Sequence, residues 1–287
     1  MNTLVGIGEI ISRSYHLYKQ HFKILIEYVL LGFTVGAVAM IVQLAAIPII
    51  IGSFLMAKYL GVILGLITII IDLALFVIGL WVNFSFIRTV SSLTIGLVPE
   101  PIMDTFKKTR PVLWKGFSAS VMSGLIMVWP LMATLSLYAI ASYILQVMGI
   151  MSFALLLKIA LVLLVLYSII HFILYAVRLC FNTFHAVIYN TPAMKAIKTS
   201  AEIVRGRWWA IFGRIFVIGL IFIAGGNLLS GILSQIGTSV GGAINILMIL
   251  LSMLVSVLVG PFMLLAMLIL FHSAEKNLTN QPPISKV

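Results

Sequence analysis

Long apolar segments alternate with short polar ones along the whole chain. Six segments hold enough consecutive apolar residues to cross a bilayer, which takes about 20 residues of helix for roughly 30 Å of hydrocarbon. They cover residues 24–47, 60–87, 117–145, 152–178, 210–232 and 243–271. The pattern predicts an all-α membrane protein with six transmembrane helices. Pro48, Pro130 and Pro261 lack an N–H group, so we expect each to bend or end a helix locally.

A shorter amphipathic stretch precedes the first, third and fifth apolar segments. Each stretch leads to an aromatic junction, which is Phe22, Trp114, or Trp208 with Trp209. Phe22, Trp114 and Trp208 are separated by 92 and 94 residues. We therefore expect a single transmembrane domain, 1–287, made of three pseudo-repeats, each an amphipathic interfacial helix plus a transmembrane hairpin. The repeat units are approximately 1–98, 99–190 and 191–287.

The third amphipathic stretch has the clearest helix signals. Thr191 is expected to cap its N-terminus, with Pro192 in the first turn and Gly206 just beyond its end. The predicted apolar stripe is Met194, Ile197, Ala201 and Val204, and the opposite polar face is Lys195, Lys198, Glu202 and Arg205. Such a helix should lie in the plane of the membrane surface.

The basic residues predict an orientation. Of 18 Lys and Arg residues, 16 lie in the N-terminal segment, in the connections 88–115 and 178–214, and in the C-terminal tail, while only Lys58 and Lys158 lie on the other side. Because cytoplasmic loops carry the excess of Lys and Arg, both termini should be cytoplasmic. Six spans are consistent with termini on one side.

Composition excludes a water-soluble protein. The chain is 62% hydrophobic and only 9% charged, against about 25% charged residues in soluble domains. The net charge is +11, and the basic residues that produce it lie between the apolar spans. In that position they favour membrane lipids, and not nucleic acid, as partners. We expect a headgroup-binding collar next to the aromatic anchors Phe22, Trp114, Trp208 and Trp209. Its members are Lys19, Lys107, Lys108, Lys198, Arg205 and Arg207.

Three ionisable residues form a candidate polar site within the membrane. They are Asp72 in the second span and His171 and Arg178 in the fourth. A charge at the bilayer centre costs about 2.5–3.5 kcal/mol on insertion scales, so Asp72 needs a proton, a cationic partner or water. His171 and Arg178 are seven residues apart on one helical face, which continues to His185, and by depth they are the expected partners. The site is either a proton or cation site, or a hydrogen-bonded acid between helices.

Small residues suggest close helix packing. Gly32 and Gly36, and likewise Gly61 and Gly65, are four apart, a spacing that lets two helices approach closely, either inside the molecule or between copies. The single cysteine, Cys180, excludes an internal disulfide and is expected to be a small buried apolar residue.

Catalytic motifs are absent from the sequence. It has no P-loop, no G-x-S-x-G motif and no metal-ligand cluster, so we expect no enzymatic activity, no cofactor and no metal. Two functions remain. One is a non-catalytic membrane module that binds anionic lipid, and possible protein partners in the membrane or cytoplasm, at the cytoplasmic leaflet. The other is a small transporter or channel with its polar site near Asp72 and His171.

Three segments resemble a known group of proteins. They are GEIISRSYHLYKQHFKILIEYVLLG, KTSAEIVRGRWWAIFGRI and GPFMLLAMLILFHSAEKNL. They are similar to the glycerophosphoryl diester phosphodiesterase membrane domain and to related uncharacterised six-span integral membrane proteins of prokaryotes. The resemblance implies a prokaryotic cytoplasmic membrane as the location. The phosphodiesterase domain to which some members are fused is not in this sequence, so the resemblance implies no activity.

Overall fold

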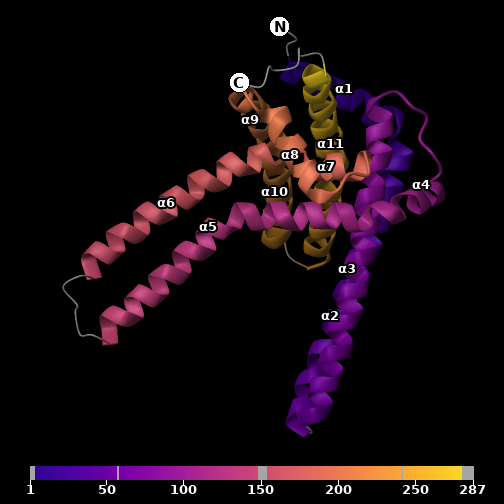
Figure 1. Ribbon diagram of the computed structural model, residues 1–287. Helices are drawn as coiled ribbons and strands as arrows, with labels where there is room; N and C mark the ends of the chain where they lie inside the picture. The colour runs from indigo at the N-terminus through magenta and orange to yellow at the C-terminus, as the bar shows by residue number, and fades with distance from the viewer. Residues whose placement is uncertain (1–3, 57, 148–153, 241, 280–287) are drawn as a thin grey trace. The chain divides into compact units, whose positions relative to one another are not determined.

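The computed structural model describes residues 4–56, 58–147, 154–240 and 242–279. All regular structure in these ranges is helical (Figure 1), which confirms the all-α prediction. The chain divides into two compact units, Met1–Leu113 with Gly213–Val287, and Trp114–Phe212. The second unit thus begins at the predicted aromatic junction Trp114 and ends just past the junction at Trp208 and Trp209.

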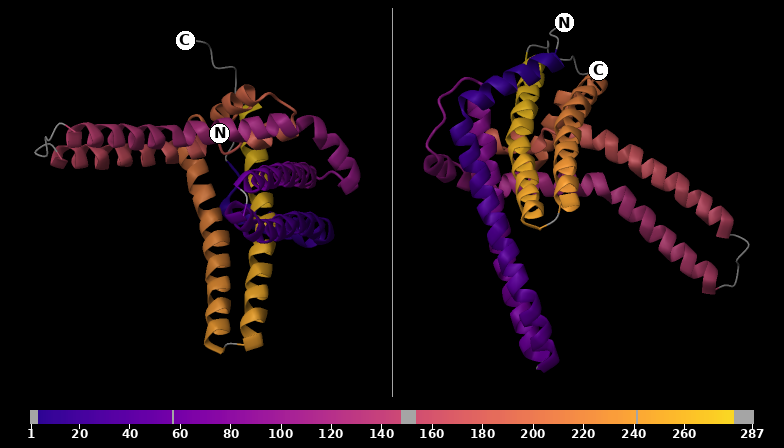
Figure 2. Two further views of the ribbon diagram at one scale, coloured as in Figure 1. Left: turned by 90° about the horizontal axis from the view of Figure 1, so that it is seen from below. Right: turned by 180° about the vertical axis from the view of Figure 1, so that it is seen from behind.

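The first unit contains two helical hairpins, two short helices and the part of α9 (Trp208–Gly219) from Gly213 on, which continues through the π-helical turn η3 (Leu220–Ala224) into the second hairpin. The first hairpin is α2 (Phe22–Met56) and α3 (Lys58–Thr94), and the second is α10 (Gly225–Val240) and α11 (Gly242–Thr279). The two helices of each hairpin lie side by side (Figures 1 and 2). The short helices are α1 (Ile7–Gln20), which packs against α11, and α4 (Ile102–Thr109), which packs against α3 and continues as the 3-10 turn η1 (Arg110–Val112).

The core of the first unit lies at one end of its long helices. The fully buried side chains include Leu25 and Tyr28 near the start of α2, Leu93 near the end of α3 and Phe271 near the end of α11. A hydrogen bond joins α2 and α3 at this end, in which the Thr89 hydroxyl donates to the Tyr28 oxygen over 2.9 Å. The end that holds α1 is therefore the packed part of the unit.

The N-terminal segment is tied to this core by hydrogen bonds to its backbone. Val5 donates its N–H to the Ser273 hydroxyl on α11 over 3.1 Å. Arg214, on α9 (Trp208–Gly219), donates to the carbonyls of Val5 over 2.8 Å and Leu4 over 3.2 Å. Hydrogen bonds between residues far apart in sequence thus hold the N-terminal segment against α9 and α11.

The second unit contains one long hairpin and two short helices. The hairpin helices are α5 (Leu113–Val147) and α6 (Ala154–Arg178), and the short helices are α7 (Asn182–Ile188) and α8 (Ala193–Val204). Small side chains let α5, α7 and α8 approach, because Ala119, Ala186 and Ala196 form one buried cluster. The Asn182 amide donates to the Ala119 carbonyl over 2.9 Å and fixes this contact.

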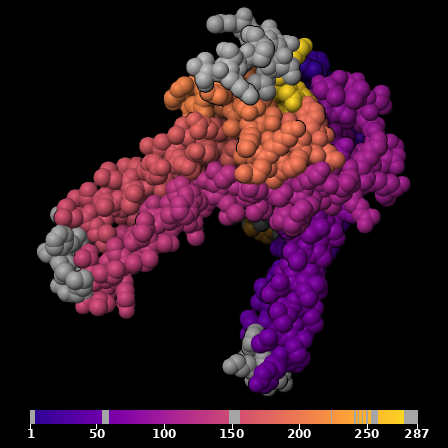
Figure 3. Space-filling view, in the orientation of Figure 1, coloured from indigo at the N-terminus to yellow at the C-terminus, as the bar shows by residue number. Residues whose placement is uncertain are grey.

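Six helical stretches of the described residues are long and apolar enough to cross a membrane, which confirms six spans. They are Phe22–Ser53, Tyr59–Thr94, Ile102–Val147, Leu156–Ile188, Trp208–Ser239 and Leu258–Lys276. Large apolar side chains in them face outward, for example Ile41 and Ile70, each 66% exposed. Figure 3 shows the surface that the α2–α3 hairpin presents on one face. The exposed apolar surface is suited to lipid.

Local predictions had mixed outcomes. The helices continue through Pro48, Pro130 and Pro261, so none of these prolines ends a helix, and α5 bends along its length (Figure 1), as expected for a helix with an interior proline. A Cβ added at Gly32, Gly36 or Gly65 would meet nothing within 4 Å, so these glycines do not mark close packing inside the unit. The close approaches lie in α10, at Gly226 and Gly237.

The predicted continuation of the fourth span also needs correction. α6 ends at Arg178, and α7 begins at Asn182, so His185 lies on a separate helix from His171. His185 is buried and its Nδ1 lies 3.0 Å from the Thr191 hydroxyl. The Thr191 side chain therefore bonds to α7 instead of capping α8, whose N-cap position is Pro192.

Candidate functional site

The predicted collar residues lie on or beside three of the four short helices, α1, α4 and α8, which we call the basic helices. Lys19 on α1, Lys107 and Lys108 on α4, and Lys198 and Arg205 at α8 are all exposed, while Arg207 is partly buried. Each basic helix buries two residues four apart on its other face. These pairs are Ile10 and Ser14, Thr105 and Thr109, and Ala196 and Ser200. The basic side chains thus lie away from the packed faces.

The buried face of α8 differs from the predicted stripe. Ile197 and Val204 are buried as expected, but Met194 is 56% exposed, and Ala196, Ser200 and Ile203 complete the buried face. Ala196 lies in the buried cluster with Ala119 and Ala186, where small side chains let α8 pack closely on its neighbours. The end of α8 is as predicted, since Gly206 has a φ of 74°, in the left-handed region that favours glycine.

Some collar residues have partners within the chain. Lys107 pairs with Asp104 over 3.7 Å, and Lys108 pairs with Glu100. These pairs are exposed, so they hold the side chains only weakly. Arg207 donates to the Ile203 carbonyl over 3.0 Å, and burial lowers the pKa of its guanidinium.

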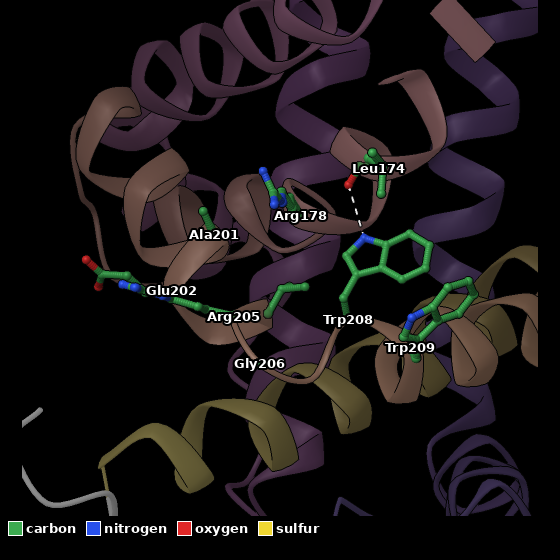
Figure 4. Close-up of a pocket in the computed structure, with 9 residues that line it drawn as sticks. Leu174, Arg178, Ala201, Glu202, Arg205, Gly206, Trp208 and Trp209 are labelled. Atoms are coloured by element: carbon green, nitrogen blue, oxygen red, sulfur yellow. Dashed lines mark hydrogen bonds between the residues drawn. The ribbon is translucent and has the colours of Figure 1, made fainter. Parts of the chain in front are cut away.

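A cleft of about 590 Å³ in the second unit brings basic and aromatic side chains together (Figure 4). Arg178, at the end of α6, and Arg205, just after α8, both line it. The remaining lining residues are Leu174, Ala201, Glu202, Val204, Gly206, Trp208 and Trp209. Arg178, predicted for the intramembrane site, thus shares this cleft with Arg205 and the aromatic anchors, whereas Lys198 and Arg207 do not line it. We call this the arginine cleft.

Ser200 fixes one side of the arginine cleft. It is fully buried, its hydroxyl donates to the Arg178 carbonyl over 2.8 Å, and it accepts the N–H of Phe181 over 3.2 Å. These two bonds satisfy backbone groups at the break between α6 and α7, where helical hydrogen bonding stops. They also hold α8 against the end of α6, which places Arg205 beside Arg178.

Trp208 fixes the other side of the cleft. Its indole N–H donates to the Leu174 carbonyl over 3.2 Å, as the dashed line in Figure 4 marks. Its ring stacks on Phe212, with centroids 5.0 Å apart and planes at 11°, and meets Trp209 edge-on. Trp209 itself is 78% exposed. The cleft is therefore lined by two indoles, that of Trp208, which is held in place, and that of Trp209, which is exposed.

Three side chains, Arg178, Tyr175 and His171, stack on one another along α6, starting at the cleft. The Arg178 guanidinium carbon lies 5.5 Å from the centre of the Tyr175 ring. The His171 ring also stacks on Tyr175, with centroids 4.3 Å apart. His171 and Arg178 therefore share one face of α6, as predicted. The Nδ1 atom of His171 is buried and has no hydrogen-bond partner in the described part of the chain.

Asp72 has a partner that the sequence argument missed. The Gln43 amide of α2 donates to the Asp72 carboxylate of α3, across the hairpin. A lone amide in the first apolar span was the available signal, because such a group also needs a partner in the membrane. His171 and Arg178 belong to the other unit, so their contact with Asp72 stays a prediction.

A second cleft, of about 410 Å³, lies in the first unit. It is lined by the end of α1, the start of α2 and the segment before α4, and it includes His21, Lys23, Glu27 and Glu100. Its acidic and basic groups are mixed, so it has no single charge preference. Across the described ranges, no three His, Cys, Asp or Glu side chains are grouped as a metal site requires.

No protein-family model matches the chain, and no curated protein or solved structure shows significant similarity to it. Function is therefore inferred from the arginine cleft, from the helices α1, α4 and α8, and from the Asp72–Gln43 pair.

Proposed function

We propose that the chain is a non-catalytic, multi-pass membrane module that binds anionic lipid at one leaflet. The observation that carries this proposal is the division of the helices α1, α4 and α8 into a buried face and an exposed basic side, as for Ser200 and Lys198 on α8. Basic groups at a membrane surface attract anionic lipid by about 1 kcal/mol each. Exposed indoles of Trp114 and Trp209 suit the same depth, where aromatic rings collect.

The proposal includes the threefold repeat. It is supported by the positions of the aromatic junctions, because Phe22 and Trp208 each begin one of the six long apolar helical stretches and Trp114 is the second residue of α5. It is also supported by Ser14 and Ser200, which are both fully buried and both lie eight residues before the junction that follows. Three copies would present three basic helices to the same leaflet.

The proposed leaflet is the cytoplasmic one, with both termini on that side, in a prokaryotic cytoplasmic membrane. The test is labelling of single cysteines in a Cys180→Ser background with a membrane-impermeant thiol reagent. Cysteines at Lys107 and Lys198 should react only after the membrane is opened, and one at Thr238, which is exposed near the end of α10, should react in intact cells. Reaction of the first two in intact cells would contradict this orientation.

Lipid binding is tested by native mass spectrometry of the purified full chain. The protein should retain phosphatidylglycerol in preference to phosphatidylcholine, and replacing Lys19, Lys107 and Lys198 together by Gln should reduce that preference. Lys158→Gln is the matched control, because this exposed lysine on α6 lies on the side predicted to face away from the cytoplasm. Equal retention of the two lipids by the unaltered protein would refute the proposal.

The alternative is a small transporter or channel with a polar site near Asp72 and His171. The buried, unpartnered Nδ1 of His171 favours it, because an unpaired polar atom in an apolar span is costly unless it has a use. The Gln43 bond to Asp72 favours the structural reading of that acid. Proton flux into proteoliposomes that disappears in His171→Gln would establish the alternative.

A further inference from the structure

We propose that the arginine cleft binds one phospholipid headgroup that carries a single negative charge, with its phosphate held by Arg178 and Arg205. This rests on the proposed lipid binding and adds to it a defined site and a ligand class. A guanidinium group suits phosphate because its planar fork of N–H donors can bond two oxygens at once. A volume of about 590 Å³ also falls within the range of about 300–1,000 Å³ that holds small ligands.

Both arginines keep donors for a ligand. Stacking on Tyr175 occupies the face of the Arg178 guanidinium and leaves the N–H bonds at its edge available. The Arg205 side chain makes no hydrogen bond or ion pair within the ranges that the structure describes. Figure 4 shows it extending beside Glu202 along the cleft. A phosphate in the cleft would supply the missing partner.

The two indoles set the depth of the site. Trp208 is held by the Leu174 carbonyl and by Phe212, so its ring is a fixed apolar surface. Indoles settle at headgroup level, with the apolar ring toward the acyl chains and the N–H toward polar groups. A lipid can place its phosphate at the arginines and its glycerol and first acyl carbons against Trp208 and Trp209. A free phosphate would contact the two arginines and would leave Trp208 and Trp209 without a ligand contact.

Glu202 restricts the charge of the ligand. It is the one acid in residues 114–212, which hold seven Lys and Arg residues, and it lines the same cleft. Arg178, Arg205 and Glu202 together carry a net charge of +1, which one singly charged headgroup neutralises. A phosphomonoester carries about −1.5 to −2 at pH 7 and brings its extra charge toward the Glu202 carboxylate. The cleft should therefore prefer phosphatidylglycerol to phosphatidic acid.

The experiment titrates the full-length protein with phosphatidylglycerol, phosphatidic acid or phosphatidylcholine at pH 8 and measures affinity by native mass spectrometry. Arg178→Gln and Arg205→Gln should each weaken phosphatidylglycerol binding on the order of tenfold. Lys195→Gln is the control, since Lys195 is exposed on α8 but does not line the cleft. Glu202→Gln should reduce the preference over phosphatidic acid, which should be up to about fivefold in the unaltered protein.

The outcomes separate the two proposals. If the unaltered protein binds anionic lipid no better than phosphatidylcholine, the proposed function fails. If it does prefer anionic lipid but the arginine variants behave like Lys195→Gln, the cleft assignment alone is overturned. Arg205→Lys replaces a Gln variant that unfolds, and it should still prefer phosphatidylglycerol over phosphatidylcholine. Displacement of the lipid by millimolar inorganic phosphate would identify a free phosphate as the ligand and overturn the lipid assignment.

Discussion

Glycines in α10 offer a graded test of how closely α10 and α11 pack. A Cβ added at Gly237 would lie 2.9 Å from the Met248 Cβ and 3.2 Å from the Asn245 Cα. The positions of a Cα and a Cβ atom are fixed by the backbone of α11, so neither atom can rotate away. Gly237→Ala must therefore push the two helices apart. The expected result is a lower free energy of unfolding.

The same helix supplies two comparisons. At Gly226 the nearest atom to an added Cβ is the Val259 Cγ2 at 3.3 Å, which needs to move by only a few tenths of an ångström, and at Gly231 nothing lies within 4 Å. Ala in place of Gly inside a helix gains about 0.5–1 kcal/mol, while overpacking costs about 1–3 kcal/mol. We therefore expect Gly231→Ala to stabilise by about 0.5–1 kcal/mol, Gly226→Ala to change little, and Gly237→Ala to destabilise by about 1–2 kcal/mol.

Unfolding in mixed micelles with increasing dodecyl sulfate, followed by circular dichroism, measures all three variants under the same conditions. The order of stability should be Gly231→Ala, then Gly226→Ala, then Gly237→Ala. A Gly237→Ala protein as stable as Gly231→Ala would refute the close approach of the two helices.

Three further substitutions test other contacts, with Lys158→Gln as the common control. Ser200→Ala should lower the free energy of unfolding by about 1–3 kcal/mol, because it strands a buried backbone N–H, and a change no larger than the control's would count against the α6–α8 link. Asp72→Asn should be tolerated while Asp72→Leu costs about 1–3 kcal/mol, and adding Gln43→Leu to the latter should restore much of the loss; additive losses would mean that the two side chains are not coupled. Arg214→Gln should speed hydrogen–deuterium exchange at residues 4–6, and unchanged exchange would show that its bonds to the N-terminal segment do not hold that segment.

The long helices follow from the sequence because their cause is local. An unbroken apolar run of bilayer length satisfies its own backbone only as a helix, so the six spans could be predicted without knowing their neighbours. Gly206 is similar, since a left-handed φ at a helix end selects glycine whatever lies around it.

The misses depend on neighbours that the local pattern does not specify. Met194 fits the helical spacing of an apolar face, but that face is filled by Ala196 and Ser200 because α8 lies close to other helices. Thr191 has the chemistry of an N-cap, yet a partner on α7 takes its hydroxyl. Glycine spacing likewise says that close approach is allowed, and only the paired helix decides whether it happens.

The candidate site likewise contains residues that the sequence places by itself and residues that only contacts between helices bring in. The sequence places Arg205, Trp208 and Trp209 at the membrane edge, since all belong to one amphipathic stretch and its junction. Arg178 joins them only because the chain breaks after α6 and Ser200 bonds across the break. Gln43 pairs with Asp72 through the register of two helices, which the amino-acid pattern of either helix leaves open.

The bond between Val5 and Ser273, residues 268 apart in sequence, has a consequence for biosynthesis. At about 5–20 residues per second, the ribosome needs roughly 13–54 s to make the residues between them. During that interval, the first residues of the chain have left the ribosome while the helix that binds them has not been made. The N-terminal helix must therefore wait at the membrane without its contacts to α11 until the last span is inserted. Truncation before α11 should leave α1 open to protease during synthesis, and completion of the chain should close it.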